Sequence, residues 1–352
     1  MPIKPPSVGT AQFKLLEKLC NAVSVSGDEN EVRKIVLEEV SPYANDIKAD
    51  ALGNLLVTKK GRGTQRIRIM LDAHMDEVGF MLVAEDGDGI YEFRTIGGLD
   101  ARNLVGKQVV VGKDHMPGVI GTKPIHLMKS EEHKHAVSAD SLRVDLGLGT
   151  KAVVGTRGTF APNFRRTGPS IMSKAIDDRM GIVILIELFK SSPSNIDVLA
   201  AFTVQEEIGC RGAKVAAYYF KPDLGIAIDS TPANDLPMQR DRENTFYNTR
   251  LGLGPAIYLA NSSIMDDFCL VHFIAETAAK GKIPFQYRQP GGGGTDAAAI
   301  QRSAAGIPVV SVSVPHRYTH TALSIARVED WKNTLSLLFA VLKRVTPDIL
   351  DR

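Results

Sequence analysis

From residue 173 onward, short apolar runs of strand length alternate with longer segments whose apolar residues recur at helical spacing. Strand-length runs lie at 197–204, 224–228, 256–259 and 309–314, and helical segments at 178–190, 213–219, 266–279 and 328–345. Before them, two helices precede strands at 54–58 and 67–72, and Ser26 with Glu29 forms a capping-box pattern for the second helix. This alternation predicts an α/β fold with a central, mostly parallel sheet flanked by helices.

The stretch from about 78 to 161 has a different pattern. Short β-rich pieces are separated there by glycine-bearing turns, and no long segment has helical spacing. At 352 residues the chain also exceeds the usual size of one compact core. We therefore expect a large domain formed by 1–76 and 168–352, with a small β-barrel-like domain inserted at 77–167.

Charge and hydropathy exclude several classes of partner. A formal net charge of +2, with no cluster of Lys and Arg, argues against a nucleic-acid partner. The longest apolar runs are of strand length, far below the ~20 residues of a membrane-spanning helix. The first ten residues hold no apolar signal core, and Cys20, Cys210 and Cys269 form no paired motif. Reduced thiols in a cytoplasmic protein are the simplest interpretation.

Acidic and histidine side chains gather where the predicted strands end. They are His74 and Asp76 after 67–72, Glu206 and Glu207 after 197–204, Asp229 after 224–228 and His320 after 309–314, with Asp177 and Asp178 opening a helix. The carboxyl ends of strands in an α/β sheet border one crevice, so distant segments can meet there. Carboxylates buried together are costly unless cations neutralise them. Imidazole and carboxylate ligands suit zinc, cobalt or manganese.

Each of these residues alone has an ordinary structural explanation. An Asp-Asp pair before a helix is commonly an N-cap that complements the helix dipole. Glu206 and Glu207 fit an exposed acidic turn, and Asp229 fits a turn at a strand end. Only the combination favours a metal site.

The order of short motifs along the chain is more specific than any single motif. These are DAHMDEVG at 72–79, SKAIDDR at 173–179, QEEIG at 205–209, GPAI at 254–257, GGTDA at 293–297 and RYTH at 317–320. The sequence resembles the tetrahedral and glutamyl aminopeptidases, a family of dinuclear metallopeptidases in which some members are labelled endoglucanases. The resemblance implies a catalytic large domain and an inserted domain that forms dimers.

The same resemblance implies a role for each candidate residue. His74 and Asp229 would bind one divalent metal ion, Glu207 and His320 the other, and Asp177 would bridge the two. Asp76 would accept the second ring N–H of His74, and Glu206 would be the general base. The peptide bond between Asp177 and Asp178 is expected to be cis. The two ions would be zinc or cobalt, with manganese possible.

The implied activity is release of N-terminal residues from short peptides by a homo-oligomer, from a dimer to a tetrahedral dodecamer. A related two-metal deacylase or carboxypeptidase is the main alternative, since it would share the metals and differ in substrate recognition. A glycoside hydrolase, or endoglucanase, needs two carboxyl groups flanking the bond and leaves the histidines unexplained. A binding protein without activity would be expected to lack Glu206, which is present.

Overall fold

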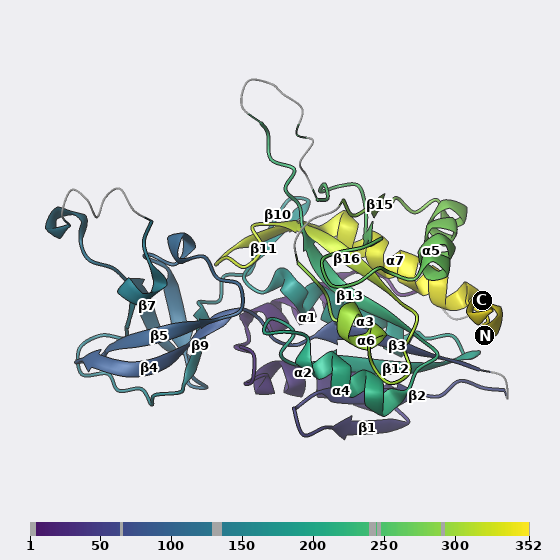
Figure 1. Ribbon diagram of the computed structural model, residues 1–352, viewed down its shortest axis with the longest axis horizontal. Helices are drawn as coiled ribbons and strands as arrows, with labels where there is room; N and C mark the ends of the chain where they lie inside the picture. The colour runs from purple at the N-terminus through teal and green to yellow at the C-terminus, as the bar shows by residue number, and fades with distance from the viewer. Residues whose placement is uncertain are drawn as a thin grey trace.

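A computed structural model describes residues 5–63, 66–128, 136–238, 244, 248–289 and 293–351. It contains a large sheet layered with helices and a separate barrel, which lies at the left in Figure 1. In chain order, the elements are α1 (Thr10–Asn21), α2 (Asn30–Val40), β1 (Asp46–Ala49), β2 (Leu55–Lys59), β3 (Ile67–His74), β4 (Gly79–Gly87), β5 (Ile90–Ile96), β6 (Gln108–Val111), β7 (Met116–Gly121), β8 (Arg143–Asp145), β9 (Arg157–Phe160), β10 (Arg165–Thr167), β11 (Ser170–Ser173), α3 (Ile176–Lys190), β12 (Ile196–Thr203), α4 (Arg211–Phe220), β13 (Leu224–Pro232), β14 (Ala256–Ile257), α5 (Phe268–Gly281), β15 (Gln286–Tyr287), α6 (Ala297–Gln301), β16 (Val309–Arg317), β17 (Ser324–Arg327) and α7 (Val328–Arg344).

The large sheet has the strand order β1-β2-β12-β3-β13-β16-β17-β11-β10. Its centre is parallel, because β12 pairs with β3, β3 with β13 and β13 with β16 in the same direction. Both flanks are antiparallel, from β1 and β2 on one side and from β17, β11 and β10 on the other. The predicted fold class is confirmed, and the antiparallel flanks are an addition to it.

Helices cover both faces of this sheet. Residues from α1, α2, α3, α5 and α7 pack on one face, and residues from α4 and α6 pack on the other. The alternation along β3 shows the two faces directly: Ile69 and Leu71 join the first core, and Met70 joins the second. Strand β12 is buried along its whole length, as expected for a parallel strand between two layers.

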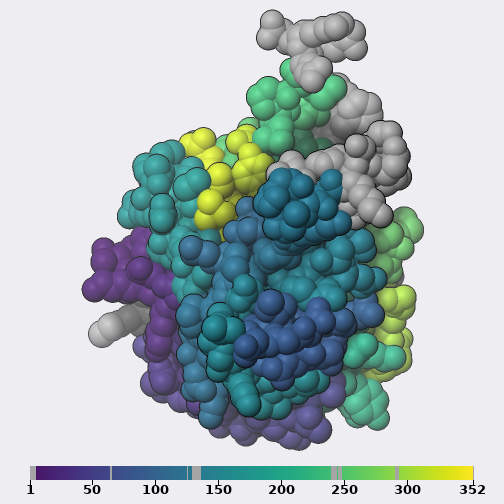
Figure 2. Space-filling view, turned by 90° about the vertical axis from the view of Figure 1, so that its left-hand side faces the viewer, coloured from purple at the N-terminus to yellow at the C-terminus, as the bar shows by residue number. Residues whose placement is uncertain are grey.

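The barrel is a closed ring of six strands, in the order β4-β5-β8-β7-β6-β9, around its own apolar core. Figure 2 looks onto this end of the molecule, where barrel residues in blue and teal cover much of the visible face. Its strands fall inside the predicted insertion at 77–167, whereas β10 pairs with β11 at the edge of the large sheet. The domain boundaries themselves stay a prediction.

The expected capping box at the start of the second helix is wrong. Helix α2 begins at Asn30 with Glu29 as its N-cap residue. The Ser26 hydroxyl instead donates a hydrogen bond of 2.6 Å to Oδ2 of Asp76, a contact that spans 50 positions of sequence.

In the described part of the chain, no helix combines the length and the apolar character needed to cross a membrane.

Candidate metal centre

The parallel strands deliver the candidate ligands to one edge of the sheet. His74 is the last residue of β3, and Asp229 lies in β13. Glu206 and Glu207 follow the end of β12, and His320 follows β16. Helix α3 brings Asp177 to the same edge from its first turn. The structure thus brings together all five predicted ligands and Glu206, as the shared carboxyl ends of the strands suggest.

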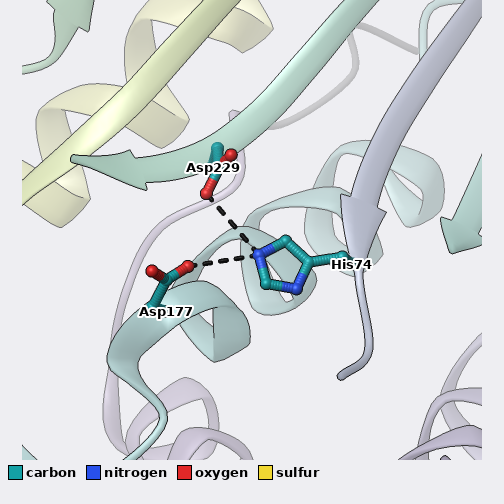
Figure 3. A group of neighbouring side chains, drawn as sticks. All are labelled: His74, Asp177 and Asp229. Carbon is teal, nitrogen blue, oxygen red and sulfur yellow. Dashed lines mark hydrogen bonds and ion pairs between the residues drawn. The ribbon is translucent and has the colours of Figure 1, made fainter. Parts of the chain in front are cut away.

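The first group of side chains is formed by His74, Asp177 and Asp229. Their ligand atoms lie within 4.8 Å of one another. Nε2 of His74 is 3.1 Å from Oδ1 of Asp177 and 3.7 Å from Oδ1 of Asp229. Figure 3 shows both carboxylates directed at the same ring nitrogen. Three side chains that converge in this way leave room for one cation between them.

The second group shares Asp177 with the first and adds Glu207 and His320. Nε2 of His320 lies 3.1 Å from Oε2 of Glu207 and 3.5 Å from Oδ2 of Asp177. One oxygen of Asp177 therefore faces His74 and the other faces His320. The peptide bond between Asp177 and Asp178 is cis, as expected. This arrangement fits a carboxylate that bridges two cations.

Asp76 is fully buried behind the first group. Its carboxylate accepts hydrogen bonds from the backbone N–H of Glu206 (3.0 Å) and of Glu207 (3.2 Å), and from Ser26. Nδ1 of His74 lies 3.1 Å from the backbone carbonyl oxygen of Asp76 and 3.5 Å from its Oδ1. Burial opposes ionisation, yet the bonds from His74, Ser26 and Glu206 hold the pKa of Asp76 below its usual value. Asp76 thus links the ring of His74 to the turn that carries the two glutamates.

Glu206 lines a cavity of about 390 Å³ that is also lined by four of the five predicted ligands, namely Asp177, Glu207, Asp229 and His320. The thiol of Cys210 donates to Oε1 of Glu206 over 3.5 Å. Burial raises the pKa of Glu206 well above its usual value, and nearby carboxylates add to this effect. The sequence predicted only reduced thiols for the three cysteines and did not indicate this contact, although Cys210 stands only four positions after Glu206.

The charges of this cluster favour a positive occupant. Burial raises the pKa of Asp229 to about 7 and also raises the pKa of Glu207. Although burial opposes protonation of His320, the carboxylates of Asp177 and Glu207 raise its pKa to about 11. Oε1 of Glu207 is buried and, among the described residues, has no hydrogen-bond partner. A donor set of imidazoles and carboxylates, with one buried oxygen left unpaired, fits divalent metal ions.

A buried ion cluster supports the segment that carries His74 and Asp76. Nζ of Lys174 lies 2.8 Å from both carboxylate oxygens of Glu77, and Nη2 of Arg179 lies 3.0 Å from Oε1. Arg179 also donates to the backbone carbonyls of Met75 and Asp76. All three charged side chains are almost completely buried. The sequence interpretation gave Glu77 no role, because its partners lie about 100 positions away.

Comparison with known proteins gives consistent results. The profile of the M42 glutamyl aminopeptidase family matches residues 53–337. A putative aminopeptidase from Acetivibrio thermocellus is 32% identical over 333 residues, which are 93% of this chain and 97% of the relative. An aminopeptidase structure from Desulfurococcus kamchatkensis has a TM-score of 0.90 at 31% identity, with 97% of each chain covered. The Pyrococcus horikoshii TET1 peptidase, which can assemble into a tetrahedron or a large octahedral shell, has a TM-score of 0.82 at 31% identity, with 95% and 100% covered.

Proposed function

The chain belongs to the M42 glutamyl aminopeptidase family, and on this premise we propose that it is a metal-dependent aminopeptidase that releases N-terminal residues from short peptides. One observation carries the proposal. Two groups of ligand-type side chains share Asp177, and Glu206 lines the same cavity. A carboxylate that stands beside a two-cation site without belonging to either ligand group suits a general base.

His74 and Asp229 would hold one divalent ion, Glu207 and His320 the other, and Asp177 would bridge them. Zinc or cobalt fits this donor set, and manganese is also compatible with it. Divalent ions held there would lower the pKa of a water molecule and polarise the scissile carbonyl.

Glu206 would accept a proton from the attacking water and return it to the leaving amine. Its burial favours this role, because it raises the pKa of Glu206 above that of an ordinary glutamate and so makes the carboxylate a stronger base. The Cys210 thiol would keep Oε1 of Glu206 oriented through its hydrogen bond. Asp76 would keep the ring of His74 in place.

Hydrolysis of matched substrates tests the proposal. Metal-stripped protein reconstituted with zinc, cobalt or manganese would be assayed on aminoacyl substrates with a free amine and on their N-acetylated forms. We expect cleavage of the free-amine forms only. Release of the acetyl group from the N-acetylated forms would indicate a deacylase, and release of C-terminal residues from peptides would indicate a carboxypeptidase. Equal cleavage of the aminoacyl bond in both forms would contradict recognition of the free amine.

The role of Glu206 is tested separately by Glu206→Gln. We expect turnover to fall by about 10²–10⁴-fold while metal content is unchanged. Glu85→Gln, at an exposed position of β4, is the matched control and should leave turnover unchanged. Normal turnover of Glu206→Gln would show that the proton acceptor is another group.

We further propose that the insertion at 77–167 joins subunits into a homo-oligomer, from a dimer to a tetrahedral dodecamer. The barrel region exposes apolar side chains, with Leu148 85%, Val153 77% and Val154 54% exposed. Apolar side chains that gather at a surface commonly mark protein contacts. Native mass spectrometry would give the assembly size, and a monomer at micromolar concentration would contradict the proposal.

A further inference from the structure

We propose that the inserted barrel is a positioning element for one of the two metal positions, the one formed by Glu207 and His320 with Asp177. The barrel would act through Gly98 and through the loop that carries His320. This inference rests on the ligand assignment of the proposed function. It adds that a ligand of this position contacts the barrel region directly, whereas His74 and Asp229 are placed by strands of the large sheet.

The loop that carries His320 needs external support. Tyr318 and His320 have φ angles of 63° and 57°, in the left-handed region that side chains other than glycine rarely adopt. Within the loop, the hydroxyls of Thr321 and Ser324 donate to the carbonyl of Tyr318. These bonds hold the turn together, but neither of them reaches the imidazole ring of His320.

The ring itself is held by the chain that follows β5 of the barrel. Nδ1 of His320 lies 3.2 Å from the backbone carbonyl oxygen of Gly98. A carbonyl oxygen only accepts, so Nδ1 must carry the proton in this contact. With Nδ1 donating to Gly98, Nε2 is the nitrogen that faces Glu207 and Asp177, and it would offer its lone pair to a cation bound between them. This is the tautomer that a metal ligand requires, and a partner on the other nitrogen fixes it.

Two neighbouring glycines allow this close approach. A Cβ atom on Gly98 would lie 3.0 Å from Nδ1 of His320. A Cβ atom on Gly97 would lie 2.7 Å from Val78 and 3.4 Å from Oε2 of Glu207. The pair therefore lies against both ligands of this metal position. A Cβ atom on Gly98 would crowd His320, whereas one on Gly97 would crowd Val78 and only touch Glu207.

The barrel also holds the backbone beyond His320. Nδ2 of Asn163, which follows the last barrel strand, donates to the carbonyl of Ala322 over 2.6 Å. Ala322 itself packs against the apolar core of the barrel, together with Leu99 next to Gly98. Figure 2 shows yellow surface from the last part of the chain beside the barrel. Three independent contacts thus connect the barrel to the His320 loop.

The other metal position is held differently. His74 is the last residue of β3, and its ring lies against Asp76. Asp229 lies within β13, which pairs with β3 and β16. Both residues are therefore placed by the large sheet. A disturbance at Gly98 should therefore lower metal affinity at the position formed by Glu207 and His320, and leave the affinity at the position of His74 and Asp229 unchanged.

Gly98→Ala tests this selectivity. The φ angle of Gly98 lies outside the left-handed region, so alanine can adopt its backbone and the added Cβ acts mainly on His320. Gly121→Ala, in β7, is the matched control, because its Cβ would meet only a carbonyl oxygen at 4.0 Å. Zinc titration of stripped protein, with cobalt absorption spectra as a second readout, measures each position.

We expect Gly98→Ala to bind the first equivalent of zinc with wild-type affinity. Its affinity for the second equivalent should be about 10–100-fold lower than that of the wild type. Its cobalt spectrum at two equivalents should match that of the wild type at one. Gly121→Ala should bind two equivalents normally. Two equivalents bound by Gly98→Ala with wild-type affinity would overturn the inference, as would equal weakening of both.

A second variant covers the case in which Gly98→Ala does not fold. Asn163→Asp removes the donor to Ala322 and keeps the oxygen that accepts from the backbone of Lys174. We expect the same selective loss of the second equivalent, and unchanged binding would again refute the inference. Wild-type protein that binds fewer than two equivalents would instead count against the proposed function.

Discussion

Replacing Asp76 by asparagine changes one atom at the point where three chain segments meet. The carboxylate accepts from Ser26 and from the backbone of Glu206 and Glu207, and it lies beside Nδ1 of His74. Asparagine keeps the size and shape of the side chain. It turns one acceptor oxygen into an amide nitrogen that carries two hydrogens.

The magnitude follows from which donors each oxygen faces. Oδ1 faces the N–H of Glu206 and the ring of His74, and Oδ2 faces Ser26 and the N–H of Glu207. In either orientation the new amide nitrogen meets donors. Each lost bond to a charged group contributes about 1.5–3 kcal/mol. Weaker support of the ligand should lower metal affinity by about 10–100-fold, or about 1.4–2.8 kcal/mol.

Calorimetric zinc titration of stripped Asp76→Asn protein measures this change, and thermal unfolding of the metal-free form measures its stability. Asp88→Asn, at an exposed loop position, is the control and should match the wild type in both. We expect the loss of zinc affinity mainly for the ion held by His74 and Asp229. Wild-type affinity in Asp76→Asn would refute the reasoning that this carboxylate positions the ligand.

Other perturbations give clear expectations. Lys174→Met removes the buried cation that donates to both carboxylate oxygens of Glu77 and should lower the free energy of unfolding by about 3–5 kcal/mol in urea. Lys18→Met breaks only an exposed ion pair, and its effect should stay below about 1 kcal/mol. Burial raises the pKa of Glu29 to about 7, so its carboxyl stays protonated in the folded state where the unfolded chain has ionised. Stability should therefore fall as pH rises from about 4.5 to about 7, and unfolding curves of Glu29→Gln should lack this contribution, up to about 3 kcal/mol. Chelation should abolish peptide hydrolysis, and zinc at 100 times its Kd should add about 2.7 kcal/mol to the unfolding free energy; a melting curve insensitive to zinc would contradict this.

The sequence predicts the central sheet and the place of the site because both depend on strong, local patterns. Apolar runs mark the strands, and the acidic and histidine residues come at or just after them. Strands β10, β11 and β17 are short, and β10 is exposed along its length, so their hydrophobic pattern is weak. The antiparallel flanks were therefore missing from the prediction.

The parts of the site that could not be predicted are long-range contacts. Ser26 matches a capping box, and only the folded chain shows that its hydroxyl reaches Asp76. The contact between Gly98 and His320 uses a backbone carbonyl, so residue type carries no signal for it. The roles of the five ligands, of Asp76 and of Glu206 stay predictions, which the structure supports by placing these residues together.

A crystal structure of the zinc-loaded protein, with anomalous diffraction at the zinc edge, would locate the bound ions. We expect two anomalous peaks, one bound by His74 and Asp229, the other by Glu207 and His320, with one oxygen of Asp177 on each. A single peak, or two peaks that do not share Asp177, would contradict the proposed ligand assignment.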